Sequence, residues 1–110
     1  LLVDASCTRL IDFDDCGFGW FAFDFAAAIS FFETDPSIPK LQAAWLDGYR
    51  TVARFEEAAE AEMATFIMLR RLQLTAWIDS HRETPTAMEM GTAFTDGTVQ
   101  IAERFLSEKG

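Results

Sequence analysis

The sequence predicts a mainly α-helical fold with a short β-hairpin at its N-terminal end, on three observations. Two short apolar runs that contain β-branched residues come first, with small polar residues between them. Apolar residues then recur at steps of three and four along most of the chain, without repeats or low-complexity segments. The 110 residues are 50% hydrophobic, enough for one domain or part of one with a core that needs no disulfide or metal. We therefore expect a hairpin followed by about four helices.

The hairpin is expected within residues 1–13. Residues 1–3 and 8–13 form its strands, and the small polar residues 4–7 suit a tight connection. The first residue is Leu rather than Met, and the opening residues resemble the middle of a strand. We therefore expect the sequence to be part of a longer chain.

The first two helices are expected on either side of a proline-containing turn. Ala, Phe and Ile dominate residues 21–32, Asp24 is placed to accept first-turn backbone N–H groups, and residues 34–39 end the segment. A second, amphipathic helix opens after Pro39. Its single apolar stripe consists of Leu41, Ala44, Trp45, Gly48, Tyr49 and Val52.

Two further helices complete the prediction. Residues 56–81 contain no helix breaker and begin with glutamates, which favours one long helix, although Arg70 intrudes on its apolar face. Residues 82–85 are expected to form a turn, and residues 98–106 place apolar side chains on one side of a terminal helix. The apolar face of the long helix is Met63, Phe66, Ile67, Leu74, Trp77 and Ile78.

Charge and composition exclude several classes of partner. There are 18 acidic and 9 basic residues, and the net charge of -9 repels a phosphate backbone, so no nucleic acid partner is expected. The longest apolar segments, residues 18–32 and 66–78, are interrupted by charges and too short for a bilayer, so no membrane partner is expected. Cys7 and Cys16 lack the spacing of a metal site or a secreted disulfide framework. We expect reduced thiols in a cytoplasmic protein.

An acidic cluster, Asp12, Asp14 and Asp15, follows the second predicted strand. Strand alternation places Asp12 and Asp14 on one face at the strand end. Carboxylates before a glycine-containing turn suit a hard divalent cation such as Mg²⁺, which takes oxygen ligands. A solvated acidic turn explains the same spacing and stays open as an alternative.

Two other sites are excluded by the rest of the chain. A calcium loop of the EF-hand type that starts at Asp12 would need an oxygen ligand at Cys16 and a bidentate Glu at Phe23. A phosphatase of the haloacid dehalogenase type also begins with Asp-x-Asp after a strand. That fold needs further parallel strands, which the helical remainder of this chain does not supply.

The stretch LIDFDDCGFGWFAFDFAAAI, residues 10–29, resembles the aminoglycoside phosphotransferase/choline kinase superfamily. In that superfamily a hydrophobic-Ile-Asp segment precedes a glycine-containing loop and a helix start like Asp24-Phe25-Ala26. LDGYRTV (residues 46–52) and MLRRLQLTAWIDSHR (residues 68–82) are similar to the helical C-terminal part of bacterial members, including those near homoserine kinase type II and stress-response kinases. The resemblance implies the C-terminal part of a protein-kinase-like α+β fold.

The resemblance also implies roles for the acidic residues. Asp12 corresponds to the Asp of the Asp-Phe-Gly element in protein kinases and would hold the Mg²⁺ that bridges the phosphates of ATP. Asp14 and Asp15 would orient a water of the metal shell or face a cationic substrate, or remain solvated turn charges. Asp24 matches a mainly structural family residue that caps the following helix. Arg70 needs a partner on its apolar face, for which Asp24 is a candidate.

Four aromatic side chains are candidates for a substrate pocket, although aromatic residues at helical spacing more often belong to a core. They are Trp20, Trp45, Tyr49 and Trp77. His81 is the sole histidine and stands near the end of the long helix. We expect it to interact with terminal carbonyl groups rather than to take part in catalysis.

The motifs that the sequence lacks limit the prediction of activity. The superfamily's His-Gly-Asp-like motif, with Asn five residues after its Asp, is not in these residues, and neither is a nucleotide-binding lobe. We expect residues 1–110 to be the C-terminal lobe of a small-molecule kinase that uses ATP and Mg²⁺ to phosphorylate a substrate hydroxyl, and to be inactive alone. The alternative is a non-catalytic, acidic helical interaction domain, and either version could form a homo-oligomer through its hairpin or an apolar face.

Overall fold

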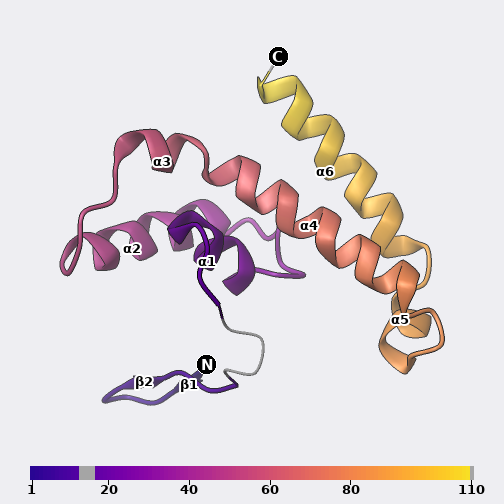
Figure 1. The fold of residues 1–110 in the computed structure, drawn as a ribbon, viewed down its shortest axis with the longest axis horizontal. Coiled ribbons are helices and arrows are strands. Elements are labelled where there is room, and N and C mark those ends of the chain that lie inside the picture. The colour runs from indigo at the N-terminus through magenta and orange to yellow at the C-terminus, as the bar shows by residue number, and fades with distance from the viewer. Residues whose placement is uncertain (13–16, 110) are drawn as a thin grey trace.

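The computed structural model describes residues 1–12 and 17–109 and is mainly helical, with a two-stranded antiparallel sheet at its start (Figure 1). The predicted fold class is therefore confirmed. No helix among these residues is long and apolar enough to cross a membrane. In chain order the elements are β1 (Leu2–Val3), β2 (Thr8–Arg9), α1 (Phe21–Ala28), α2 (Ile38–Arg50), α3 (Glu57–Ala61), α4 (Met63–Ser80), α5 (Pro85–Met90) and α6 (Ala93–Lys109).

The hairpin is held by its own turn. Leu2 pairs with Arg9 and Val3 with Thr8, so β2 is shorter than predicted. The Asp4 carboxylate accepts hydrogen bonds from the Ser6 N–H at 2.8 Å, the Ser6 hydroxyl at 2.7 Å and the Cys7 N–H at 2.9 Å. These bonds, the Ser6 hydroxyl first, lower the pKa of Asp4 to about 2, because they favour the ionised form. The strands are exposed on both faces and lie apart from the helices in Figure 1.

The first two helices occur where the sequence predicts them, with different ends. The segment expected to be helical through residue 32 ends at Ala28, because the chain turns at Phe31, where φ is +74°. The α2 helix begins at Ile38 with Pro39 in its first turn, where the missing N–H costs nothing. The Asp35 carboxylate accepts from the N–H and hydroxyl of Ser37, and these bonds lower the pKa of Asp35.

The long helix predicted over residues 56–81 is two helices. Glu62, with φ −92° and ψ 0°, separates α3 from α4. Met63 follows this break directly and is 1% exposed, the most deeply buried large side chain among the described residues. The apolar pattern placed Met63 on the packing face correctly but did not reveal the break at Glu62.

The expected turn at residues 82–85 leads into a short helix that the sequence did not predict. The Thr84 hydroxyl accepts a hydrogen bond from the Ala87 N–H at 3.2 Å, and Pro85 occupies the first turn of α5. Together they form a helix start. Gly91, with φ +54°, then allows the turn into α6, which begins at Ala93, earlier than predicted.

An apolar core joins α1, α2 and the first half of α4. Phe25 contacts Trp45, with ring centroids 5.8 Å apart, and Phe55 meets Trp45 edge to face at 5.5 Å. We call this cluster the N-terminal core; its buried members are Ala22, Phe25, Ile29, Ile38, Leu46, Phe55 and Met63. It fixes the position of α1 against α2 and α4.

The contact between α4 and α6 is built around a buried arginine. The Arg71 guanidinium donates to a Glu33 carboxylate oxygen at 2.9 Å, the Thr98 hydroxyl at 2.8 Å and the Phe94 carbonyl at 2.8 Å. We call these four residues the Arg71 network. A Cβ at Gly97 would lie 3.0 Å from an Arg71 nitrogen, so a glycine here leaves room for the guanidinium.

The neighbouring arginine differs from its prediction. Arg70 donates to the Ser30 hydroxyl at 2.9 Å rather than pairing with Asp24. The buried cation of α4 is Arg71, which is 6% exposed. Because consecutive helical residues point about 100° apart, Arg70 meets the chain just after α1 while Arg71 reaches α6.

Candidate functional site

Asp12, the predicted metal ligand, lies just beyond the hairpin rather than on its second strand. Its side chain is exposed, and its backbone adopts φ +64°. A left-handed conformation is uncommon outside glycine, although Asp tolerates it better than most residues. Asp14 and Asp15, predicted for the metal shell or the substrate, lie outside the described residues.

The donor chemistry at Asp12 fits a magnesium ion that is shared with phosphate groups. Among residues 1–12 and 17–109 no group of three or more His, Cys, Asp or Glu side chains comes together to hold a metal. Mg²⁺ usually takes only one or two protein carboxylates and completes its shell with water and substrate phosphates. An accessible carboxylate such as Asp12 meets that requirement.

Trp20 connects the glycine-containing loop to α1. It is the N-cap residue of α1, with extended backbone angles, and is 70% exposed. Its ring lies 5.8 Å from that of Phe66 on α4, measured between centroids. A cavity of about 490 Å³ opens beside it, lined by Gly17, Phe18, Gly19, Trp20, Phe21, Phe23, Asp24 and Ala27. Trp20, predicted for a substrate pocket, therefore lines a cavity next to the loop that follows Asp12.

Asp24 shares that cavity from the first turn of α1. Its side chain is exposed, and among the described residues it makes no hydrogen bond, while Trp20 occupies the N-cap position. A carboxylate in the first turn still interacts favourably with the positive end of the helix dipole. The wider structural role that the family resemblance gives Asp24 stays a prediction.

The other predicted pocket aromatics are not gathered around Trp20. Trp45 and Tyr49 pack against the N-terminal core, with their ring centroids 5.1 Å apart. Trp77 lies near the other end of α4, where it stacks on His81 at 4.5 Å. The four aromatic residues therefore lie in three different places. Trp20 lines a cavity, Trp45 and Tyr49 pack against the core, and Trp77 stacks on His81 at the end of α4.

His81 behaves as expected from its position. It is the C-cap residue of α4, and its Nδ1 lies 2.9 Å from the Trp77 carbonyl oxygen. The interaction with a terminal carbonyl is therefore confirmed.

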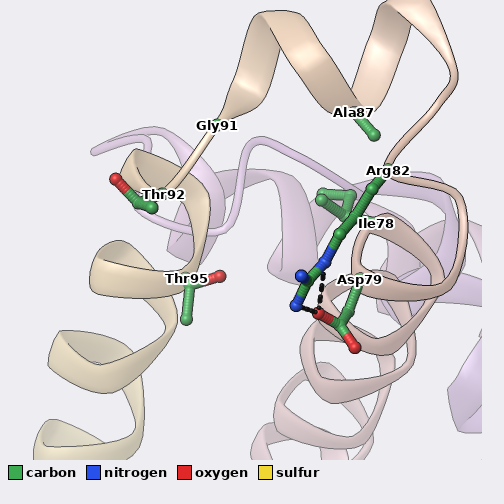
Figure 2. A pocket seen from close by; sticks show the side chains of 7 residues that line it. All are labelled: Ile78, Asp79, Arg82, Ala87, Gly91, Thr92 and Thr95. Carbon is green, nitrogen blue, oxygen red and sulfur yellow. Dashed lines mark hydrogen bonds and ion pairs between the residues drawn. The ribbon is translucent and has the colours of Figure 1, made fainter.

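A separate cavity of about 390 Å³ lies where α4, α5 and α6 meet (Figure 2). Arg82 lies against Asp79 in an exposed ion pair, and Thr95 stands on the facing helix. The sequence did not indicate this cavity, because one wall is α5. The signal that could have found it is the Thr84-Pro85 helix start. Its lining is Ile78, Asp79, Arg82, Ala87, Gly91, Thr92 and Thr95.

The comparison with family models covers the part of the chain that contains Asp12. The model of the phosphotransferase enzyme family matches residues 1–66, which include the hairpin, Asp12, Trp20 and all of α1 and α2. No curated protein and no solved structure matches the chain. Because the match covers more than half of the 110 residues, the chain belongs to the phosphotransferase enzyme family.

Proposed function

We propose that this chain is the helical C-terminal portion of an ATP-dependent kinase that transfers the γ-phosphoryl group to a hydroxyl of a small molecule. The observation that carries the proposal is Asp12. Its exposed carboxylate follows the hairpin inside the family-matched region, at the residue that the resemblance assigns to the metal. The glycine-containing loop and α1 follow in the order that the family pattern requires.

In this proposal the Asp12 carboxylate contributes one oxygen ligand to the metal. When bound, Mg²⁺ would neutralise the negative charge that develops on the phosphates of ATP. Asp24, in the first turn of α1, stabilises the helix start that follows the loop. Trp20 lines the cavity beside this loop, where it can contact the acceptor molecule.

The acceptor's proton needs a separate base. Residues 1–110 contain no His-Gly-Asp motif, so we propose that the catalytic Asp and the nucleotide-binding lobe come from outside these residues. In the same proposal residues 1–110 alone are inactive. The net charge of -9 favours a cationic acceptor, and aminoglycosides, amino alcohols such as choline, homoserine and protein Ser/Thr all belong in the substrate panel.

The test is Asp12→Asn in the protein that also contains the nucleotide-binding lobe. We expect Mg²⁺-dependent turnover to be abolished and the circular dichroism spectrum to be unchanged, because an exposed carboxylate is replaced by its isostere. Asp35→Asn is the matched control, since Asp35 is also exposed and lies in a loop. Turnover retained in Asp12→Asn would reject this residue as the metal ligand.

A second candidate function is homo-oligomerisation as an acidic interaction domain, and the hairpin favours it. Val3 is 71% exposed, and the apolar side chains of Leu2 and Leu10 are also exposed, near strand edges that no other described strand pairs with. We expect residues 1–110 to dimerise or aggregate in sedimentation experiments, and Val3→Lys to reduce this association. A stable monomer at all concentrations would exclude this candidate.

A further inference from the structure

A second cavity beside Trp20 has a different chemical character. It encloses about 360 Å³ where the start of α1 meets the α2–α3 linker, α3 and α4. This volume lies within the range of small-molecule pockets and is too small for a partner helix. Its lining consists of Gly19, Trp20, Phe21, Ala22, Arg54, Phe55, Glu56, Ala59 and Phe66.

The walls of this cavity are aromatic and anchored. Phe55 and Ala22 are buried members of the N-terminal core, and Phe66 packs against that core. Trp20 lies against Phe66 with its ring tilted by 42°. Phe21 is 67% exposed, so one wall stays accessible to solvent. The Trp20 and Phe66 rings contact each other, with their centroids 5.8 Å apart, and form one aromatic wall. A flat apolar ring packs favourably against such a wall, because aromatic groups prefer tilted or offset contacts.

The charged groups at the cavity cancel each other. Arg54 and Glu56 are the charged residues in the lining, and their side chains pair through two contacts, at 2.7 Å and 3.1 Å. Both are mostly exposed, which places the ion pair toward solvent. A guanidinium already paired with a carboxylate offers net attraction to neither a cation nor an anion. The remaining lining is apolar or backbone, so the cavity favours an uncharged ligand.

Small residues keep the cavity open. A Cβ at Gly19 would meet no described atom within 4 Å, and Ala59 contributes only a methyl group from α3. We propose that this cavity binds an uncharged small molecule that carries a flat apolar ring. The proposal needs neither the metal nor the nucleotide, so it goes beyond the phosphotransfer function and is tested separately from it.

The first experiment compares three probes of one ring system in the absence of nucleotide. Naphthalenemethanol is neutral, naphthoate is an anion and naphthylmethylammonium is a cation. By titration calorimetry we expect saturable binding of the neutral probe, with both charged probes at least about tenfold weaker. Equal or tighter binding of either charged probe, or no saturable binding of the neutral probe, would overturn the proposal.

The second experiment locates the binding site. Ala59→Leu fills the cavity, and we expect it to weaken binding of naphthalenemethanol by about tenfold or more. Ala58→Leu adds the same side chain to the same helix at an exposed position outside this lining, and should leave binding unchanged. Trp20→Ala should also weaken binding, although Trp20 lines the neighbouring cavity too, so Ala59→Leu decides between the two cavities. Wild-type affinity in Ala59→Leu would overturn the site, as would self-association of the wild-type chain that Ala59→Leu abolishes.

Discussion

The α4 helix packs against its neighbours in two physically different ways. Its first half joins α1 and α2 through the N-terminal core, where apolar and aromatic side chains are buried together. Its middle meets α6 through the Arg71 network, where a buried cation satisfies three acceptors from two directions. One helix thus combines a contact that depends on buried area with a contact that depends on individual atoms.

The difference determines how each contact responds to change. Apolar burial contributes roughly in proportion to area, so the loss of a few methyl groups weakens it gradually. A buried ion pair tolerates the loss of one partner poorly, because the other charge is left without compensation. Arg71 also lies over the Phe94 ring, 3.5 Å from its centroid, so several interactions depend on one side chain.

Replacing Arg71 should have the largest effect on stability. In Arg71→Ala the carboxylate of Glu33, which is 2% exposed, loses its ion-pair partner. We expect the free energy of unfolding to fall by about 3–5 kcal/mol in chemical denaturation. Arg70→Ala is the matched control and should cost less, because Ser30, its partner, is uncharged. Equal losses of stability in the two variants would show that the ion pair with Glu33 adds nothing beyond an uncharged hydrogen bond.

Truncating Met63 should have the next largest effect and tests the N-terminal core. We expect Met63→Ala to lower the free energy of unfolding by about 3 kcal/mol, because it removes buried apolar volume and leaves a cavity. Met88, which is exposed on α5, supplies the control, and Met88→Ala should change stability little. A comparable loss at both positions in thermal denaturation would argue against a core centred on Met63.

A smaller effect is expected at the α6 side of the Arg71 network. Thr98→Val keeps the shape of the side chain but removes the hydroxyl that accepts from Arg71. We expect the free energy of unfolding to fall by about 1–2 kcal/mol. Amide hydrogen exchange should accelerate more in α6 than in α1. Thr95→Val, at an exposed position on the same helix, should leave exchange unchanged. Uniformly faster exchange throughout the chain would show that the two contacts of α4 are not separable.

The smallest effect is local to the hairpin, which neither contact of α4 supports. Ser6→Ala removes the largest cause of the low pKa of Asp4, which should rise from about 2 toward 3.8 in an NMR titration of the carboxyl group. The pKa of Asp4 in the folded hairpin, about 2, lies below its ordinary value of 3.8. The stability from this turn is therefore present above pH 3.8 and is lost as the pH falls through about 2. Exchange protection of the helices should not change.

The apolar contact was predictable from the sequence only in part, and the polar contact was not. Apolar spacing predicted α2 and placed Met63 on a packing face, and Pro39 marked a helix start. The predicted stripe of α2 was wrong in its register, because Leu46 is buried while Leu41 and Val52 are exposed.

Apolar spacing also assigned Arg70 to the buried face of the long helix, because a spacing pattern assumes that each helix packs on one face only. Since α4 packs on two sides, Arg71 was missed. Its partners Glu33 and Thr98 are distant in sequence and meet it only in the folded chain.

The candidate site was predictable in part. Resemblance to the family indicated Asp12, but its left-handed backbone depends on the path of the chain after β2 and has no signal in the residue pattern. Among the four aromatic candidates, sequence spacing did not separate Trp20, which lines cavities, from Trp45 and Tyr49, which pack against the core. Missing the short α5 helix also concealed one cavity wall, although Thr84 and Pro85 carry its start signal.

Glu33 links the family-matched residues to residues that lie beyond the match. One of its oxygens accepts from the Phe31 N–H at 3.2 Å, at the left-handed turn after α1, and the other accepts from Arg71. The matched region ends at residue 66, inside α4, and so includes the acid but not the base. Folding of the family-matched region therefore depends on Arg71, which lies beyond it on α4. A chain that ended at residue 66 would leave the Glu33 carboxylate without its ion-pair partner.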